Sequence, residues 1–231
     1  MKVEVLADVD SVARHAAEVI AGEARAAVKA RGRFTVAVSG GRTPWVMLRA
    51  LSSLDVPWKN VHVLQVDERV APADHADRNL LSLCASLLAD GQPGRAQIHA
   101  MPVESPDLDE AAARYAETLV ELAGAPPVLD LVHLGLGPDG HTASLVPGDP
   151  VLDVTNADVA LTGLYQGRRR MTLTYPVLNR ARRVLWLITG ADKAAMLARL
   201  CRGDSSIPAG RVRQDHASVV ADRAAAQSPT G

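Results

Sequence analysis

The turn from strand to helix on which our fold prediction rests is the stretch FTVAVSGGRTP, residues 34–44. Residues 34–38 are a compact apolar run of strand-forming side chains, and the two glycines after Ser39 end that strand. Thr43 followed by Pro44 is typical of a helix N-cap with proline at the first helical position, and we expect this helix to reach about residue 51. An apolar strand, a glycine loop and a helix in this order are the repeating unit of an α/β protein.

The same alternation repeats on both sides of this stretch. Apolar runs predict strands at 3–6, 61–66, 129–134 and 184–188, with weaker candidates at 98, 159–164 and 171–174. Helical spacing predicts helices at 10–32 with Asp10 as the N-cap, at 79–88 ended by Gly91, at 107–122 and at 191–200. Near-continuous apolar strands alternating with amphipathic helices indicate a single α/β domain with a mostly parallel, doubly wound sheet flanked by helices. We place this Rossmann-like domain at residues 1–226 and a flexible tail at 227–231.

Composition and charge limit the classes of partner. The 231 residues include 25 basic and 26 acidic side chains, for a formal net charge of −1. This balance argues against a nucleic-acid or membrane partner, so any attraction for an anion has to be local. Cys84 and Cys201 lack the spacing of a disulfide framework or a zinc cluster. With no signal-peptide or membrane-spanning pattern, we expect a cytoplasmic protein. The sequence does not fix the oligomeric state, and a monomer is one possibility.

In open α/β sheets, ligands bind beyond the carboxyl ends of the strands, and four loops of unusual composition start there. The first loop follows residues 34–38. Its glycines allow the backbone to approach a ligand closely, and the free N–H groups at the start of the next helix favour an anion. An ordinary glycine turn is the alternative, and the loop lacks the GK[ST] of a Walker A motif. The candidate ligands here are Ser39, Gly40, Gly41, Arg42 and Thr43.

The second loop is Asp67-Glu68-Arg69, a dense cluster of charges directly after an apolar strand. Asp67 is placed where a carboxylate can bind sugar hydroxyls or move a proton. Arg69 can hold a phosphate or a carboxylate through its planar guanidinium. The alternative is a solvated loop with local ion pairs.

The third loop is GLGPDGHTASL, residues 135–145. It presents His141 beside Asp139, the pairing that orients a general base, although a lone histidine is more often structural. The stretch also matches the GxGxxG dinucleotide fingerprint, and we reject that interpretation. Pro138 removes a backbone N–H from the turn, and Pro147-Gly148 would cut short the helix that the fingerprint requires.

The fourth loop, residues 190–193, follows the strand at 184–188. Lys193 is expected in the first turn of a helix, which is unfavourable for a cation unless an anion binds there. We therefore take it as a candidate phosphate ligand, with an ordinary surface lysine as the alternative. In the basic run Arg168-Arg169-Arg170, we favour only Arg170, which is nearest the following strand.

Taken together, these segments resemble the 6-phosphogluconolactonases, within the wider family that includes glucosamine-6-phosphate deaminase. The match runs in order from about residue 33 to 210, through 39–44, 67–69 with Pro72 and Asn79, 135–147, 170–174, 190 with 193, and 207–208. The resemblance implies a NagB-type fold and hydrolysis of 6-phospho-D-glucono-1,5-lactone to 6-phospho-D-gluconate in the oxidative pentose phosphate pathway. It implies neither a metal nor an organic cofactor, and only a small-molecule partner.

Two positions bear on the choice between the two chemistries of this family. The deaminases have tyrosine where this chain has Arg69, and a glutamate that supports their histidine at the position of Val146. Valine can neither accept a proton nor hydrogen-bond an imidazole, so the resemblance favours lactone hydrolysis. Lactonases often have serine at the position of Arg78 and phenylalanine at that of Val146, and the first departure puts the role of Arg78 at the pocket rim in doubt.

The predicted mechanism gives His141 the role of general base toward water, because a typical imidazole titrates with a pKa of about 6.5. Asp139 orients the ring, and Asp67 binds sugar hydroxyls. Loop N–H groups, helped by Arg69, stabilise the oxyanion. The phosphate ligands are Gly40, Gly41, Arg170 and Lys193. Three alternatives stay open at this stage: a deaminase or isomerase, a non-catalytic sugar-phosphate-binding protein, and a nicotinamide-dependent oxidoreductase.

Overall fold

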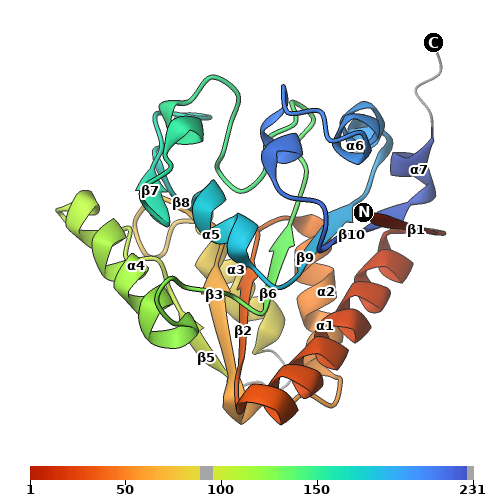
Figure 1. Ribbon diagram of the computed structural model, residues 1–231, viewed down its shortest axis with the longest axis horizontal. Coiled ribbons are helices and arrows are strands. Elements are labelled where there is room, and N and C mark those ends of the chain that lie inside the picture. The colour runs from red at the N-terminus through yellow and green to blue at the C-terminus, as the bar shows by residue number, and fades with distance from the viewer. Residues whose placement is uncertain (89–95, 228–231) are drawn as a thin grey trace.

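A central sheet of seven parallel strands organises the protein. The computed structural model describes residues 1–88 and 96–227. Across the sheet the strands follow the order β1-β10-β9-β6-β2-β3-β5, and every pair of neighbours is parallel (Figure 1). Their bounds are β1 Lys2–Leu6, β2 Phe34–Val38, β3 Val61–Gln65, β5 Gln97–His99, β6 Leu131–Leu134, β9 Val184–Ile188 and β10 Ala217–Asp222.

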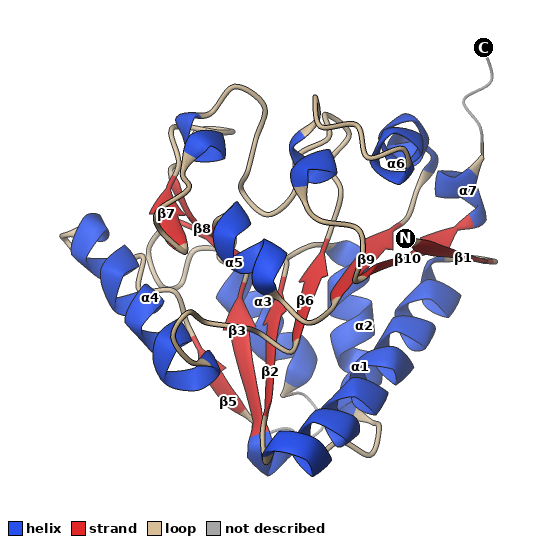
Figure 2. Ribbon diagram, viewed as in Figure 1, coloured by secondary structure: helices blue, strands red, loops and turns tan. Residues whose placement is uncertain are grey.

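Helices cover both faces of this sheet (Figure 2). They are α1 Val9–Arg31, α2 Arg42–Ser52, α3 Asn79–Leu87, α4 Leu108–Ala123, α5 Tyr175–Arg180, α6 Ala194–Cys201 and α7 Arg223–Ala226. Because strand side chains alternate between faces, Val36 packs into a core with α1, α2 and α3, while its neighbour Ala37 packs into a core with α4, α5, α6 and α7. The α/β, doubly wound architecture expected from the sequence is therefore confirmed.

A second, antiparallel sheet lies at the edge of the ligand-binding end. It contains β4 Asp67–Arg69, β8 Arg170–Leu173 and β7 Val159–Leu161, in the order β4-β8-β7. The prediction of a polar loop at 67–69 was wrong, because the backbone of these charged residues pairs with β8 as a strand. Residues 159–164 form a shorter strand than predicted.

Several other predictions need correction. β10 was not predicted, although it lies between β1 and β9 and is paired with both. The N-cap of α1 is Asp8, which accepts a hydrogen bond from the Ser11 N–H at 2.8 Å, and not Asp10. The segment expected as one helix at 191–200 begins with a 3-10 turn, Ala191–Lys193, before α6. The predicted helix stop at Gly91 and most of the predicted tail lie outside the described residues.

The strand order fixes where a ligand can bind. From β2 the chain continues to β3 on one side, and β6 later takes the place on the other side of β2. The loops after β2 and β6 therefore separate and leave a crevice at the carboxyl ends of the strands. In Figure 1 the arrow of β6 points to the end of the molecule that carries β7 and β8. Over the described ranges, none of the helices is long and apolar enough to cross a membrane.

Candidate active site

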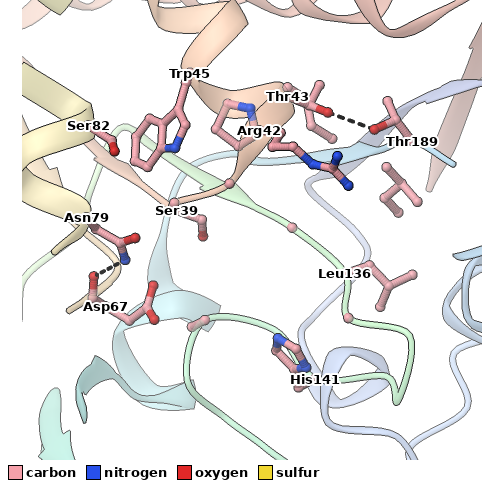
Figure 3. Close-up of a pocket in the computed structure, with 18 of the residues that line it drawn as sticks. Ser39, Arg42, Thr43, Trp45, Asp67, Asn79, Ser82, Leu136, His141 and Thr189 are labelled. Carbon is pink, nitrogen blue, oxygen red and sulfur yellow. Dashed lines mark hydrogen bonds between the residues drawn. The ribbon is translucent and has the colours of Figure 1, made fainter. Parts of the chain in front are cut away.

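A cavity of about 500 Å³ opens at this crevice (Figure 3). The residues around it come from the loops after β2, β6 and β9, from the starts of α2 and α3, and from the small sheet. Asp139 is not among the lining residues, but it contacts His141, which is. The predicted site residues that line the cavity are Ser39, Gly40, Gly41, Arg42, Thr43, Asp67, Arg69, His141, Arg170 and Lys193.

The loop after β2 is held by hydrogen bonds to β6. The Ser39 N–H donates to Nδ1 of His133 at 3.2 Å, and the Ser39 hydroxyl donates to the His133 carbonyl at 3.2 Å. Burial lowers the pKa of His133 to about 3, so this ring is neutral and its Nδ1 accepts. A Cβ at Gly40 would lie 2.2 Å from Oδ1 of Asn79, so a larger residue there would displace the Asn79 side chain. The sequence therefore builds a fixed floor for the cavity.

Helix α2 starts directly at the cavity. Its N-cap is Gly41 and not Thr43, so the prediction for the helix start was wrong by two residues. The Thr43 hydroxyl instead forms a hydrogen bond with the hydroxyl of Thr189, at 2.7 Å, which joins the loops after β2 and β9. Because Gly41 has no side chain to cap the helix, the first N–H groups of α2 depend on a ligand or water. The exposed side chain of Arg42 lies at the same place.

Asp67 reaches the cavity from β4. Its Oδ2 accepts a hydrogen bond from the Ser144 hydroxyl at 2.6 Å, and Nη1 of Arg170 donates to that hydroxyl at 3.5 Å. Figure 3 shows Asp67, Ser39 and His141 around the same space. Ser144 thus couples the loop after β6 to the small sheet, and it holds the Asp67 carboxylate in one orientation.

Glu68 points the opposite way, into the protein, and is fully buried. Its two oxygens accept hydrogen bonds from the backbone N–H groups of Asn79 and Leu80, each at 2.8 Å, at the start of α3. Nε of the buried Arg78 lies 3.4 Å from Glu68 Oε2, and its Nη1 donates to Glu104 Oε1 at 2.6 Å. The guanidinium of Arg78 therefore contacts one buried carboxylate, Glu68, and one half-exposed carboxylate, Glu104. These ion pairs are the role that the structure gives to Arg78.

Arg69 lies at the cavity wall and is held from one side. Its Nη1 donates to the Asp77 carbonyl at 2.7 Å and to Oδ1 of Asn79 at 3.0 Å. Asn79 in turn donates from Nδ2 to the Asp67 carbonyl at 3.1 Å. These two bonds use a single guanidinium nitrogen, Nη1, and they fix the orientation of the Arg69 side chain. Arg69 lines the cavity.

His141 and Asp139 form a direct pair. His141 Nδ1 lies 2.5 Å from Asp139 Oδ1, which also accepts from the His141 backbone N–H at 3.1 Å. Burial raises the pKa of Asp139, but the hydrogen bonds and the charge of His141 outweigh it and lower the pKa overall. The ionised carboxylate can only accept, so Nδ1 carries the proton and Nε2 is left as the basic nitrogen. A Cβ at Gly137 would lie 2.0 Å from His141 Nδ1, so this pair requires glycine there.

The glycine-rich loop after β6 uses its own N–H groups. Gly137 N–H donates to the His141 carbonyl at 2.8 Å, and Gly140 N–H donates to the Gly137 carbonyl at 3.0 Å. These two groups are thus engaged and do not suit the oxyanion role predicted for the loop. Residues 141–148 continue as turns, whereas a dinucleotide fingerprint leads into a helix.

The charges around the cavity are mostly positive. The basic residues Arg42, Arg69, Arg78, Arg170 and Lys193 line it, against the acidic residues Asp67 and Asp192. Lys193 is the N-cap residue of α6, and its Nζ lies 3.1 Å from Oδ2 of Asp192. Arg78 is paired with Glu68 and Glu104, whereas within residues 1–88 and 96–227 Arg42, Arg69 and Arg170 form no ion pair with a carboxylate. Burial lowers the pKa of Arg170, an effect that the charge of Asp67 opposes. The cavity therefore has an excess of positive charge that an anionic ligand would neutralise.

Sequence reasoning missed several polar residues of this site, including Ser144, Thr189 and Tyr165. Ser144 lies within the predicted loop at 135–145, but its contact with Asp67, 77 residues away in the sequence, depends on the pairing of β4 in the small sheet. Thr189 directly follows the strand β9, so the rule that ligands collect at strand ends could have found it. Among the described residues, the histidine, cysteine and acidic side chains do not form groups of three or more suited to a metal ion.

Fold and cavity together define an α/β protein whose candidate active site lies at the switch point of a parallel sheet. The chain belongs to the family described as glucosamine-6-phosphate isomerases/6-phosphogluconolactonase, whose model matches residues 7–221. It is 39% identical over 178 residues to a 6-phosphogluconolactonase of Synechocystis, covering 75% of this chain and 74% of the relative. It is 35% identical to one of Mycobacterium tuberculosis, covering 99% and 98%. The fold is that of a 6-phosphogluconolactonase from Shewanella baltica, with a TM-score of 0.86, 24% identity, and coverage of 96% and 97%.

Proposed function

We propose that this enzyme hydrolyses 6-phospho-D-glucono-1,5-lactone to 6-phospho-D-gluconate, the lactonase step of the oxidative pentose phosphate pathway. The observation that carries the proposal is the Asp139–His141 pair at the edge of a cavity lined by Arg42, Arg69 and Arg170, which form no ion pair with any described carboxylate. A base beside an anion-binding cavity suits hydrolysis of a phosphorylated ester. The names of the curated relatives support the same substrate.

In the proposed reaction, Nε2 of His141 takes a proton from water as the water oxygen attacks the lactone carbonyl carbon. A tetrahedral intermediate forms, with its negative charge on the former carbonyl oxygen. The intermediate collapses with cleavage of the bond between this carbon and the ring oxygen. The imidazolium returns its proton to the leaving ring oxygen, which becomes a hydroxyl, and the new carboxylic acid loses its proton to solvent. One water is consumed, and His141 ends the cycle neutral.

The remaining side chains position the substrate. Gly40 and Gly41, with the free N–H groups at the start of α2, hold the phosphate together with Arg170 and Lys193. Ser39, Arg42 and Thr43 complete that loop. Asp67 accepts hydrogen bonds from sugar hydroxyls. Because two glycine N–H groups after β6 are engaged, we give the oxyanion to Arg69 and to the loop after β2.

The same features argue against a deaminase. In that chemistry a glutamate supports the histidine from the position of Val146, which here is a buried apolar side chain. The carboxylate that contacts His141 in this structure is Asp139. A pair that activates water is enough for lactone hydrolysis, whereas ring opening and isomerisation need further proton-transfer groups.

The test is turnover of freshly generated 6-phosphogluconolactone, with the spontaneous rate subtracted and glucosamine 6-phosphate assayed in parallel for ammonia release. We expect lactone turnover without ammonia. Ammonia release would assign the deaminase chemistry, and inactivity on both substrates would leave a non-catalytic sugar-phosphate-binding protein.

A further inference from the structure

A hairpin at residues 165–168 connects β7 and β8 of the small sheet and contacts His141 and Arg170, two residues that line the cavity. Tyr165 and Arg168 exchange backbone hydrogen bonds, at 3.0 and 3.2 Å. Gln166 and Gly167 between them both have positive φ, 52° and 78°, which matches the tight two-residue turn of a β-hairpin. The hairpin therefore has a defined geometry, and it can present its side chains in fixed directions.

Tyr165 contacts the catalytic pair from outside. Its hydroxyl donates to Asp139 Oδ2 at 3.2 Å, while the other oxygen of that carboxylate accepts from His141. Its ring packs edge-on against the His141 imidazole, with 5.5 Å between ring centroids and 65° between planes. Asp139 is thus held at both oxygens, and Tyr165 supplies the contact on the side away from the base.

The same hairpin contacts Arg170. The guanidinium carbon of Arg170 lies 4.9 Å from the centroid of the Tyr165 ring, and its Nη2 donates to Gln166 Oε1 at 3.2 Å. A cation over an aromatic face is attracted to it, and more so when partly desolvated. Tyr165 thus links the predicted base to a predicted substrate-binding cation.

Arg168 connects the hairpin to the loop before α3. Its Nε donates to Asp77 Oδ2 at 2.7 Å, and its Nη2 lies 2.9 Å from Nε2 of His75. The Asp77 carbonyl accepts from Arg69, so the hairpin is connected to the other wall of the cavity. The sequence favours only Arg170 of this basic run as a site residue, whereas the structure places Arg168 between the hairpin and Asp77.

We propose that Tyr165 is a positioning residue that sets the orientation and basicity of the Asp139–His141 pair. The proposal rests on the function proposed above. By donating to Oδ2, the phenol disperses part of the negative charge of Asp139 and fixes the plane of the carboxylate. The other charged groups near the pair are Arg170 on β8 and, beyond it, Asp67 on β4; both are unchanged when only the hydroxyl is removed.

The test is Tyr165→Phe, which keeps both ring contacts and removes the hydrogen bond. We expect kcat to fall roughly three- to tenfold with KM within twofold of wild type, because the hydrogen bond acts on the base and not on substrate binding. The acid limb of the pH profile of kcat/KM should move to higher pH by a few tenths. Leu164→Ala, an exposed neighbour in the same segment, should change neither quantity.

A readout without turnover separates this proposal from the proposed function. In an NMR titration, the midpoint of the ring signals of His141, assigned by their loss in His141→Ala, should rise by a few tenths in Tyr165→Phe. That rise would support the positioning role even in a protein without lactonase activity. An unchanged or lower midpoint would overturn it, even if the wild type hydrolyses the lactone.

Discussion

Two acid–base pairs lie at the carboxyl end of the sheet, and they differ in what surrounds them. Glu68 and Arg78 are 0% and 2% exposed, and the Glu68 carboxylate accepts from several N–H groups of the protein. Asp139 and His141 have 37% and 22% of their side chains exposed, and the ring has one nitrogen left over. Similar chemical groups thus take different roles: a buried pair whose carboxylate accepts from backbone N–H groups can stabilise a helix start, whereas an open pair can exchange a proton with a ligand.

The largest expected effect is on stability, from Glu68→Ala. This change leaves Arg78 without its buried partner and the first N–H groups of α3 without an acceptor. We expect a loss of about 3–5 kcal/mol in the free energy of unfolding, measured in urea. Glu104→Ala is the matched control, because its half-exposed carboxylate also contacts Arg78, and it should cost less than about 1 kcal/mol. Equal losses in the two variants would contradict the contrast.

The next effect is on catalysis, from Asp139→Asn. An amide can donate as well as accept, so it no longer fixes the proton on Nδ1 of His141. We expect kcat to fall about 10- to 100-fold, with thermal unfolding little changed because Asp139 is partly exposed. A kcat within twofold of wild type would remove Asp139 from the proposed pair.

A third variant, Lys193→Ala, tests the binding side of the cavity. Loss of one charge-assisted contact to the phosphate should raise KM about tenfold and leave kcat nearly unchanged. The exposed Lys59 at the other end of the sheet provides the control variant, Lys59→Ala. With glucono-1,5-lactone, which lacks the phosphate, the wild type and Lys193→Ala should have the same KM. An unchanged KM for the phosphorylated lactone would remove Lys193 from the site.

The smallest effect concerns His133, a second histidine, which is fully buried whereas His141 is partly exposed. Because burial lowers the pKa of His133 to about 3, the unfolded chain binds this proton more readily than the folded one as the pH falls below about 6.5. Stability should therefore decrease with falling pH, by about 1 kcal/mol between pH 7 and 5.5 from this residue. His133→Asn keeps an acceptor for the Ser39 N–H. Its free energy of unfolding should therefore fall by about 1 kcal/mol less than that of the wild type between pH 7 and 5.5. The same pH dependence of the free energy of unfolding in the two proteins would contradict the lowered pKa of His133.

Much of the fold follows from local patterns in the sequence. The apolar run at 34–38 and the glycines after it predict a buried strand and its turn, because few other structures suit those residues. The rule that ligands collect at the carboxyl ends of parallel strands then brings distant loops together. It correctly places residues from the loops after β2, β6 and β9 around one cavity.

What sequence reasoning missed depends on tertiary pairing. The strand at 67–69 carries charged side chains, and only its pairing with β8 makes it a strand. The environment of Arg78 follows from the packing of α3 against β4. The spacing of Asp139 and His141 allowed a contact, but the fold of the loop around Gly137 determines that it forms. Tyr165 contacts the pair from a hairpin at residues 165–168, which no periodic pattern in the sequence predicts.

The most direct test of the central claim is the turnover of 6-phosphogluconolactone by His141→Ala, with unfolding measured on the same preparation. We expect kcat to fall by a factor of about 100 or more while the free energy of unfolding changes by less than about 1 kcal/mol. His15→Ala, which removes a histidine at the β1 edge of the sheet, should keep wild-type activity. Near-wild-type turnover by a folded His141→Ala protein would contradict the role of His141 as the base.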